Sequence, residues 1–213
     1  MFIFYIFWGA VSAMKLLVIR HGESEADLLD VYEGRADFPL TERGHRQAEA
    51  MSVFVKKNFD VSAVYCSPLK RAFQTAVHLA EATAAPLVVE EKLMEFNNGL
   101  IAGLERRVAD EKYPMVSALP VHDSVYGQES ALEFRFRADY ILSRIISQTA
   151  AEDTAAIVTH GGVINQLYRS FLRLPIDSDI FFETGNTGMH SWCLDDAHRR
   201  VMMANYTAHA EGV

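Results

Sequence analysis

Cysteine is scarce in this sequence. Cys66 and Cys193 are the only two among 213 residues, and neither belongs to a CxxC pair. We therefore expect neither a disulfide framework nor a zinc site built from cysteines. So few thiols fit a reducing compartment, and on this basis we expect the protein to be cytoplasmic. Long linkers, repeats and low-complexity tracts are also lacking, so nothing in the composition divides the chain into several domains.

Basic residues are outnumbered, with 20 Lys and Arg against 28 Asp and Glu and a net charge of −8. A nucleic-acid-binding domain needs a basic face, so we expect no nucleic-acid partner. The net acidic charge still allows one small basic pocket for a phosphate. Half of the residues are apolar and 23% are charged, which is typical of a globular protein that can bury a sizeable core.

The sequence lacks an apolar run long enough to cross a bilayer, which takes about 20 residues. Its most conspicuous uncharged segment runs from Phe2 to Ala13, and no positive charge precedes it as in a secretory signal. We interpret residues 1–13 as an upstream over-extension, with Met14 as the natural start, and residues 14–213 as a single domain. The alternatives are a signal or anchor, or an additional packed segment. We expect no membrane partner.

The remaining chain alternates between short apolar runs and amphipathic stretches. Apolar runs predict strands, and helical spacing predicts helices, one of them capped by Thr41 and another by Ser67 with Pro68 at its first position. Strands alternating with helices predict an α/β three-layer sandwich, with a mostly parallel central sheet, helices on both faces and a terminal antiparallel hairpin. The predicted strands are 15–19, 61–65, 86–90 and 155–158; the helices begin at 41, 67, 130 and 161; the hairpin is 190–206. Residues 91–128 predict a loop-rich insertion that covers a site.

Polar motifs follow three of the predicted strands. RHGES occupies residues 20–24, SPLKRAFQTA occupies 67–76, and THGG occupies 159–162. In open α/β sheets, ligands bind beyond the carboxyl ends of the strands, so we expect these three motifs to meet at one place. A carboxyl that could act as a general acid, Glu95, lies within LMEFNNG in the insertion.

The residue types suit phosphate chemistry. An Arg beside a His keeps the imidazole uncharged and binds phosphate oxygens through two hydrogen bonds. Arg71 falls in the first turn of its predicted helix, where a positive charge is unfavourable unless something negative lies nearby. His160 can donate to a phosphate oxygen. Taken singly, each motif also has an ordinary explanation, such as a paired surface Arg or a capping His.

Together, the four motifs resemble the histidine phosphatase superfamily, the group that includes the cofactor-dependent phosphoglycerate mutases. They occur in the order and spacing of that family, and residues 32–44 (YEGRADFPLTERG) resemble the family segment that follows RHG. The resemblance covers about residues 15–206. It implies a phosphoglycerate mutase-like fold and a phosphohistidine formed on His21. It also implies a phosphate pocket of Arg20, Arg71 and His160, with Glu95 as general acid and base.

Three further residues have weaker expectations attached. Many family members carry Asn at the position of Asp27, where an Asp would repel a phosphate dianion unless it points away or bonds to Arg20 or Arg35. Ser24 and Gly161 are expected to be secondary substrate contacts.

The resemblance leaves three functions open, of which phosphomonoester hydrolysis is the expected one. Glu95 and His160 are only 65 positions apart, and Gly162 stands where mutase-like members tend to carry Asn. Both features favour a phosphatase over a mutase. The acid-phosphatase branch usually has a late His-Asp pair, which His160-Gly161 does not match. The third alternative is a phospho-ligand binding protein without turnover.

We expect no cofactor and no metal ion, the latter because the sequence contains neither HExxH nor a carboxylate cluster near the two motif histidines. The expected partner is a small-molecule phosphomonoester, with the oligomeric state left open. Of the apolar residues of the insertion, some are expected to belong to the core and some to line the leaving-group side of the pocket, which would tolerate many alcohols.

Overall fold

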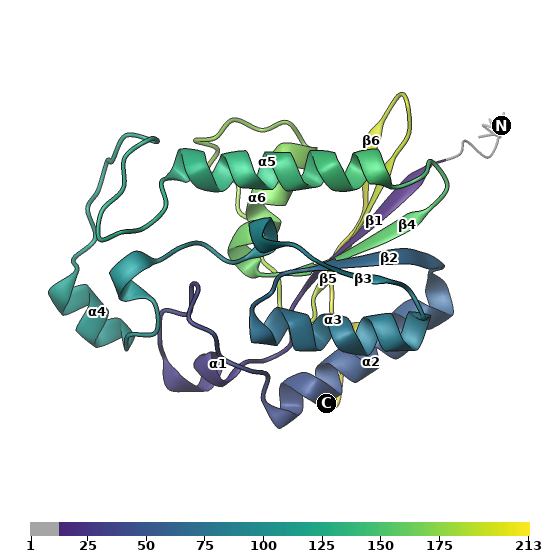
Figure 1. Ribbon diagram of the computed structural model, residues 1–213, viewed down its shortest axis with the longest axis horizontal. Coiled ribbons are helices and arrows are strands. Elements are labelled where there is room, and N and C mark those ends of the chain that lie inside the picture. Colours follow the sequence, from purple (N-terminus) through teal and green to yellow (C-terminus); the bar gives the residue numbers. More distant parts are fainter. Residues whose placement is uncertain (1–12) are drawn as a thin grey trace, which may run out of the picture.

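The computed structural model describes residues 13–213, and its six strands form one sheet in the order β3-β2-β4-β1-β5-β6 (Figure 1). Strands β1 to β4 are parallel, whereas β5 is antiparallel to β1 and β6 is antiparallel to β5. The predicted α/β class, the mostly parallel sheet and the terminal hairpin are thereby confirmed. The strands are β1 Met14–Arg20, β2 Val61–Cys66, β3 Leu87–Val89, β4 Thr154–Thr159, β5 Met189–Leu194 and β6 Arg199–Tyr206. The proposed extension, residues 1–13, lies outside the described residues except for Ala13.

Helices cover both faces of the sheet because the central strands are apolar on both sides. Leu16 and Val18 of β1 belong to the core under helices α5 (Ala131–Gln148) and α6 (Gly161–Phe171). Leu17 and Ile19, whose side chains alternate with them, belong to the core under α2 (Glu42–Asn58) and α3 (Lys70–Thr83). Figure 1 shows these two helical layers on opposite sides of the sheet.

The helix starts agree with the sequence in three places, including α6 at Gly161, and differ in one. Thr41 caps α2 by accepting a hydrogen bond from the Gly44 N–H at 2.9 Å, as predicted. Ser130 caps α5 in the same way. The predicted cap at Ser67 is wrong, because α3 begins at Lys70 after Leu69. The Ser67 hydroxyl accepts from the Leu69 N–H in a local turn and also contacts the histidine that follows β4.

The insertion at 91–128 is largely irregular, as predicted, but it contains short helices that the sequence pattern did not indicate. These are the 3₁₀ turns η1 (Glu91–Leu93) and η2 (Gly99–Ile101) and the helix α4 (Arg106–Lys112). A further short helix that was not predicted, α1 (Glu25–Leu29), follows β1. Both α1 and α4 lie on the same side of the molecule, beyond the carboxyl end of β1 (Figure 1). A final 3₁₀ turn, η3, spans Ala208–Ala210.

Candidate active site

The turns after β1, β2 and β4 are joined directly to one another. The backbone N–H of His21 donates to the carbonyl of Thr159 at 3.0 Å, and that of Ser67 donates to Val158 at 3.2 Å. These bonds continue the parallel ladder one residue beyond the strands. As a result the three motifs meet at one edge of the sheet, as the sequence predicted.

The loop after β1 packs so closely on the start of α2 that side chains are excluded there. A Cβ on Gly22 would lie 2.5 Å from the carbonyl oxygen of Gly44, and one on Gly44 would lie 2.0 Å from that of Glu23. The Gly22 N–H also donates to Thr75 Oγ1 of α3 at 3.1 Å. These contacts fix the backbone on either side of His21.

His21 is almost completely buried, with 1% of its surface exposed. Its Nδ1 lies 2.7 Å from the Gly22 carbonyl, which can only accept, so Nδ1 carries the proton and Nε2 keeps its lone pair. Burial, with added repulsion from Arg71 and Arg20, holds the pKa of His21 well below its usual range. At neutral pH the ring is therefore uncharged and nucleophilic at Nε2.

The second motif histidine, His160, stacks at a tilt beside the first, with 5.1 Å between the ring centroids. Its Nε2 lies 2.9 Å from Ser67 Oγ. Ser67 has no other acceptor for its hydroxyl proton among the described residues, so this proton points to Nε2 and leaves the N–H at Nδ1. That Nδ1 is buried and has no partner in the described part of the chain. Burial and nearby Arg71 keep the pKa of His160 well below normal.

Two arginines border the histidines, each with one buried nitrogen that donates no hydrogen bond. Arg71 is fully buried and donates to the carbonyls of Ala36 and Gly34 at 3.0 and 2.8 Å. Arg20 donates to the carbonyl of Thr184 at 2.7 Å. The Nε atoms of both arginines are buried and donate no hydrogen bond to any residue in the described range. With His160 Nδ1, this makes three buried nitrogens near His21 that donate no hydrogen bond within the described range, one of which, Arg71 Nε, is engaged in an ion pair.

The expected negative partner of Arg71 is Glu33, a residue that the motif analysis did not single out. Its Oε1 lies 3.1 Å from Arg71 Nε, and Ser24 Oγ donates to the same oxygen at 2.5 Å. Ser24 also contacts Asp27 and is fully buried, so its hydroxyl is already engaged. Glu33 belongs to the segment 32–44 that resembles the family, and this was the available signal for it.

The Asp27 carboxylate is engaged by hydrogen bonds and lies beside Arg20, which is one of the arrangements that the sequence analysis allowed for an Asp at this position. Its carboxylate accepts from the Ser24 N–H at 2.8 Å and from Asn186 at 3.2 Å. Its other oxygen lies 3.7 Å from Arg20, not Arg35. The side chain therefore holds the first turn of α1 and contributes one negative charge next to Arg20.

Glu95 is held in place by backbone N–H groups. Its Oε2 accepts from Gly162 at 2.9 Å and its Oε1 from Phe96 at 2.7 Å. Gly162 lies in the first turn of α6, where the helix dipole favours a carboxylate. A Cβ at this position would lie only 2.4 Å from Glu95 Oε1, so the absence of a side chain makes the contact feasible.

The loop that carries Glu95 depends on Arg137 of α5, which sequence analysis also missed. Its guanidinium donates to the carbonyls of Lys92, Met94 and Glu95 at 2.8, 2.6 and 3.1 Å. It pairs with Glu129 at 2.7 Å, and both side chains are about nine-tenths buried. An arginine among the apolar positions of a predicted helix was the signal that could have found it.

An open pocket of about 500 Å³, which we call the central pocket, lies above these groups. Arg20, His21, Glu33, Glu95 and Gly161 line one side of it, and residues 181–185 with Asn205 line the other. The expectation that apolar residues of the insertion would line the leaving-group side was wrong. Phe181 and Phe182 supply the apolar surface there instead, because residues 173–188 return across the carboxyl end of the sheet.

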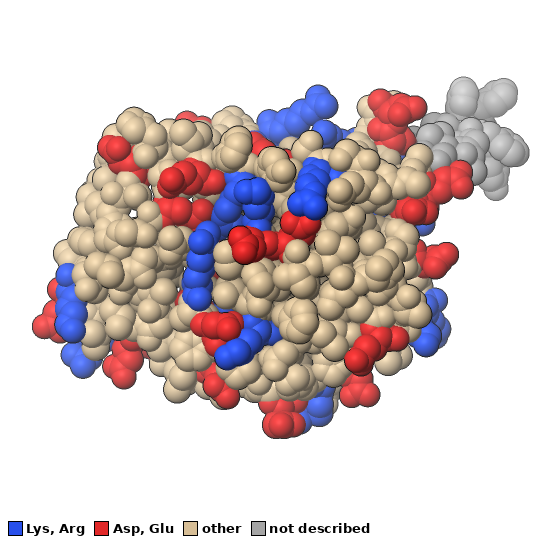
Figure 2. Space-filling model, viewed as in Figure 1, with Lys and Arg blue, Asp and Glu red and all other residues tan. Residues whose placement is uncertain are grey.

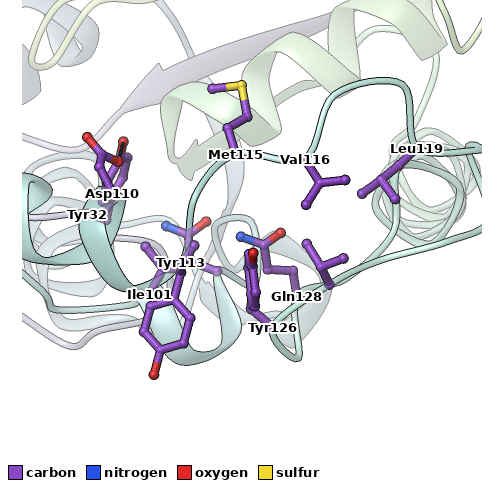
Figure 3. Close-up of a pocket in the computed structure, with 11 residues that line it drawn as sticks. Tyr32, Ile101, Asp110, Tyr113, Met115, Val116, Leu119, Tyr126 and Gln128 are labelled. Carbon is purple, nitrogen blue, oxygen red and sulfur yellow. Dashed lines mark hydrogen bonds between the residues drawn. The ribbon is translucent and has the colours of Figure 1, made fainter.

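The apolar residues of the insertion line a separate pocket of about 200 Å³, the insertion pocket. Figure 3 shows Met115, Val116 and Leu119 facing Tyr113 and Tyr126 across it, with Tyr32 and Asp110 at one end. None of the described residues lines both pockets.

Two features are absent from residues 13–213. No helix there is long and apolar enough to cross a membrane, and no group of three or more His, Cys, Asp or Glu is placed to hold a metal ion. On the face shown in Figure 2, Lys and Arg side chains alternate with Asp and Glu side chains.

Comparison with known proteins gives consistent matches. The chain is 26% identical over 200 residues to phosphoserine phosphatase 1 of Hydrogenobacter thermophilus, covering 92% of this chain and 94% of the relative. It is 26% identical over 198 residues to glucosyl-3-phosphoglycerate phosphatase of Mycobacterium tuberculosis, covering 88% and 87%. The crystal structure of the α-ribazole phosphatase from Shigella flexneri has the same fold, with a TM-score of 0.79 at 24% identity, covering 92% and 98%. The family model of the histidine phosphatase superfamily (branch 1) matches residues 16–207, so the chain belongs to that superfamily.

Proposed function

We propose that the protein hydrolyses small phosphomonoesters through a phosphohistidine formed on His21. One observation carries this proposal: three buried nitrogens, on Arg20, Arg71 and His160, have no hydrogen-bond partner within the described range and surround an uncharged histidine. Unpaired buried donors cost free energy, so their convergence calls for a ligand with several acceptor oxygens. A phosphoryl group meets that requirement.

In the first step, His21 Nε2 attacks phosphorus. The P–N bond forms as the P–O bond to the leaving alcohol breaks, and Glu95 in its protonated form gives its proton to the departing oxygen. The two arginines and His160 Nδ1–H donate to the equatorial oxygens, where charge is concentrated in the transition state. The remaining rate acceleration comes from the sheet edge, which holds the reacting groups in position. Phosphoryl transfer requires little other covalent chemistry from the protein.

In the second step, water attacks the phosphohistidine. Glu95, now ionised, accepts a proton from that water as the P–N bond breaks, and inorganic phosphate leaves with His21 restored. The backbone N–H groups of Gly162 and Phe96 fix the orientation of the carboxylate for this step. The open central pocket admits water, which favours hydrolysis over transfer back to the substrate.

The substrate class that we propose is a small phosphorylated metabolite. The named relatives act on phosphoserine and on glucosyl-3-phosphoglycerate, both small organic phosphates. We also propose that the enzyme works in the cytoplasm, which is supported by Cys66 and Cys193 both being free thiols.

The test is to incubate the purified enzyme with a panel of phosphomonoesters that includes phosphoserine, phosphoglycerates and nitrophenyl phosphate. Release of free phosphate is the expected result, and acid-labile, base-stable labelling of the protein after rapid quenching is expected to report the phosphohistidine. Movement of phosphate between positions of one sugar acid would instead identify a mutase. Binding of phosphate without turnover of any ester would identify a binding protein.

A further inference from the structure

Glu33 lies where a bound phosphate has to lie. Its Oε1 is 3.1 Å from Arg71 Nε, and its Oε2 is 3.9 Å from Nε2 of His21. The side chain is 18% exposed and lines the central pocket. A phosphorus atom attacked by His21 and held by Arg71 would bring its oxygens into contact with this carboxyl group.

The charges around Glu33 do not let an ionised carboxylate and a phosphate dianion coexist easily. The titratable and charged groups that face it come from β1 (Arg20 and the adjoining His21), α1 (Asp27) and α3 (Arg71), and Glu95 of the loop after η1 lies near Arg71. The two arginines contribute two positive charges, whereas Glu33, Asp27 and Glu95 contribute three negative ones when all are ionised. A dianion adds two more, and repulsion at such short range opposes binding.

Glu33 cannot leave this position by a simple shift of its backbone. The preceding residue, Tyr32, is bonded on both sides, with its N–H on Leu104 at 2.9 Å and its carbonyl accepting from Gly103 at 2.7 Å. The carbonyl of the following residue, Gly34, accepts from Arg71 at 2.8 Å. The Tyr32 hydroxyl is fixed as well, by Asp110 at the end of the insertion pocket (Figure 3).

Neutralisation removes the repulsion while the carboxyl group keeps its position. Burial raises the pKa of Glu33, and this outweighs the opposing effects of Arg71 and the Ser24 hydroxyl. Proton uptake would convert the group from an acceptor that repels the ligand into a donor. Its oxygen already lies within the reach of a phosphate oxygen held by Arg71.

We propose that Glu33 is a substrate-binding residue that acts as the neutral carboxylic acid. Binding of a dianion is coupled to the uptake of one proton from solvent onto the Glu33 carboxyl, whose O–H then donates to an oxygen of the ligand. This inference rests on the proposed function only in that both place a phosphoryl group beside His21. Because binding requires proton uptake, the affinity for dianions should fall as pH rises through the pKa of Glu33 in the free enzyme, by up to about tenfold per pH unit.

The experiment is calorimetric titration with sulfate, which remains a dianion between pH 5 and 8 and does not itself take up a proton there. Titrations at pH 7.5 in two buffers of different ionisation enthalpy count the protons taken up. We expect the wild type to take up about one more proton per sulfate than Glu33→Gln, which keeps a donor but cannot titrate. Any uptake by His21 or His160 is common to both proteins and cancels. Glu183→Gln, which removes another carboxyl on the pocket wall, should keep the wild-type count.

Equal proton counts in the wild type and Glu33→Gln overturn the inference, and so does a lack of sulfate binding by the wild type throughout pH 5–8. If Glu33→Gln does not fold, Glu33→Ala replaces it in the same comparison, since it requires no hydrogen-bond geometry. Sulfate binding does not require turnover. A protein that shows the proton difference but releases phosphate from no ester therefore supports the inference while overturning the proposed function.

Discussion

Two parts of the candidate active site are built by different means. His21, Arg71 and His160, which we call the floor, are at most 1% exposed, and each lies directly after a strand or in the first turn of a helix. The Glu95 loop, residues 91–98, is half-buried and contains only one 3₁₀ turn. The sheet register positions the floor, whereas long-range hydrogen bonds position the loop. Substitutions of the floor residues should therefore slow the chemical step itself, and substitutions around the loop should misplace Glu95.

The Glu95 loop is the more easily displaced of the two parts, because residues far away in the sequence hold it in place. Arg137 bonds three of its carbonyls from a helix more than 40 positions away, and Thr159 Oγ1 holds the carbonyl of Leu93 at 2.8 Å. Removing one partner of the buried Arg137–Glu129 pair leaves an uncompensated charge, which typically costs about 3–5 kcal/mol. The acid can thus be misplaced by changes that never touch the substrate.

The largest effect should come from the floor. His21→Ala removes the nucleophile, and we expect turnover to fall by roughly 10⁴-fold or more. The fold should persist, because the flanking backbone is held by bonds that do not involve the imidazole. Turnover of nitrophenyl phosphate and thermal unfolding measure the two quantities.

The control is His122→Ala, which changes an exposed histidine of the insertion and should retain wild-type activity. If His21→Ala keeps a substantial fraction of the wild-type rate, His21 is not the nucleophile.

The next effect concerns the acid in the Glu95 loop. For alkyl phosphates, Glu95→Gln should slow the phosphorylation step by about 10²–10⁴-fold, because the departing alkoxide requires a proton. Nitrophenolate scarcely requires one, so its release should be nearly spared in that step. Dephosphorylation should still slow, because the same residue handles the attacking water. Rapid mixing should therefore reveal a burst of nitrophenolate followed by slow turnover.

Glu91→Gln provides the matched control, as Glu91 is a nearby exposed carboxyl in η1. Equal loss of the phosphorylation rate for both kinds of substrate would show that Glu95 is not the leaving-group acid.

A smaller effect should come from a substitution that displaces the Glu95 carboxyl without removing it. Gly162→Ala places a methyl group 2.4 Å from Glu95 Oε1, so the carboxyl has to move, while Gly161→Ala places one in open space. We expect Gly162→Ala to lose roughly 10- to 100-fold for alkyl phosphates, and much less for nitrophenyl phosphate. The alkyl-to-aryl ratio of kcat is the readout. Stability should change little, because only a flexible side chain is displaced.

Gly161→Ala should leave that ratio unchanged, whatever it does to KM. A shifted ratio in both variants would mean that the first turn of α6, rather than the contact with Glu95, determines the effect.

The sequence was sufficient to predict that the floor residues lie together, because each of them belongs to a local sequence pattern. Buried apolar strands ended by RHG, SPLKR and THG determine where the side chains emerge, and parallel register brings the three ends together. The strands and the four long helices follow from the same patterns. The start of α3 does not follow from these patterns. Ser67 is a residue type that often caps helices, but its hydroxyl contacts His160 instead.

The rest could not be predicted because it depends on tertiary contacts between distant segments. Nothing local to Glu33 indicates that its carboxyl meets Arg71, 38 positions later, and nothing local to Arg137 indicates three carbonyl partners in the loop. The apolar insertion was predicted to line the leaving-group side, yet it folds around its own pocket. Apolar composition alone does not specify which surface a loop covers.

The smallest effect concerns His190 of β5 and the way the free energy of unfolding depends on pH. Burial lowers the pKa of His190 to about 4. The ring accepts at Nδ1 from Asn205 N–H at 3.1 Å, so Nε2 carries the proton and donates to Thr184 Oγ1 at 3.0 Å, and the Thr184 carbonyl in turn binds Arg20. The unfolded chain takes up a proton on this histidine near pH 6.5 and the folded chain does not. The free energy of unfolding should therefore fall as pH is lowered from about 6.5 to 4, by at most about 1.4 kcal/mol per pH unit from His190.

His190→Asn should reduce that slope, because the Asn carbonyl can accept at the place of Nδ1 but does not titrate. Urea unfolding between pH 4.5 and 7 measures it. His122→Asn should leave the slope unchanged, since an exposed histidine binds protons alike in both states. The buried His21 and His160 add to the slope in the same direction and remain in both variants, so the difference belongs to His190. An identical slope in His190→Asn and the wild type would mean that this ring is already charged in the folded protein, and that the hydrogen bonds between β5, Thr184 and Arg20 are not those of a neutral imidazole.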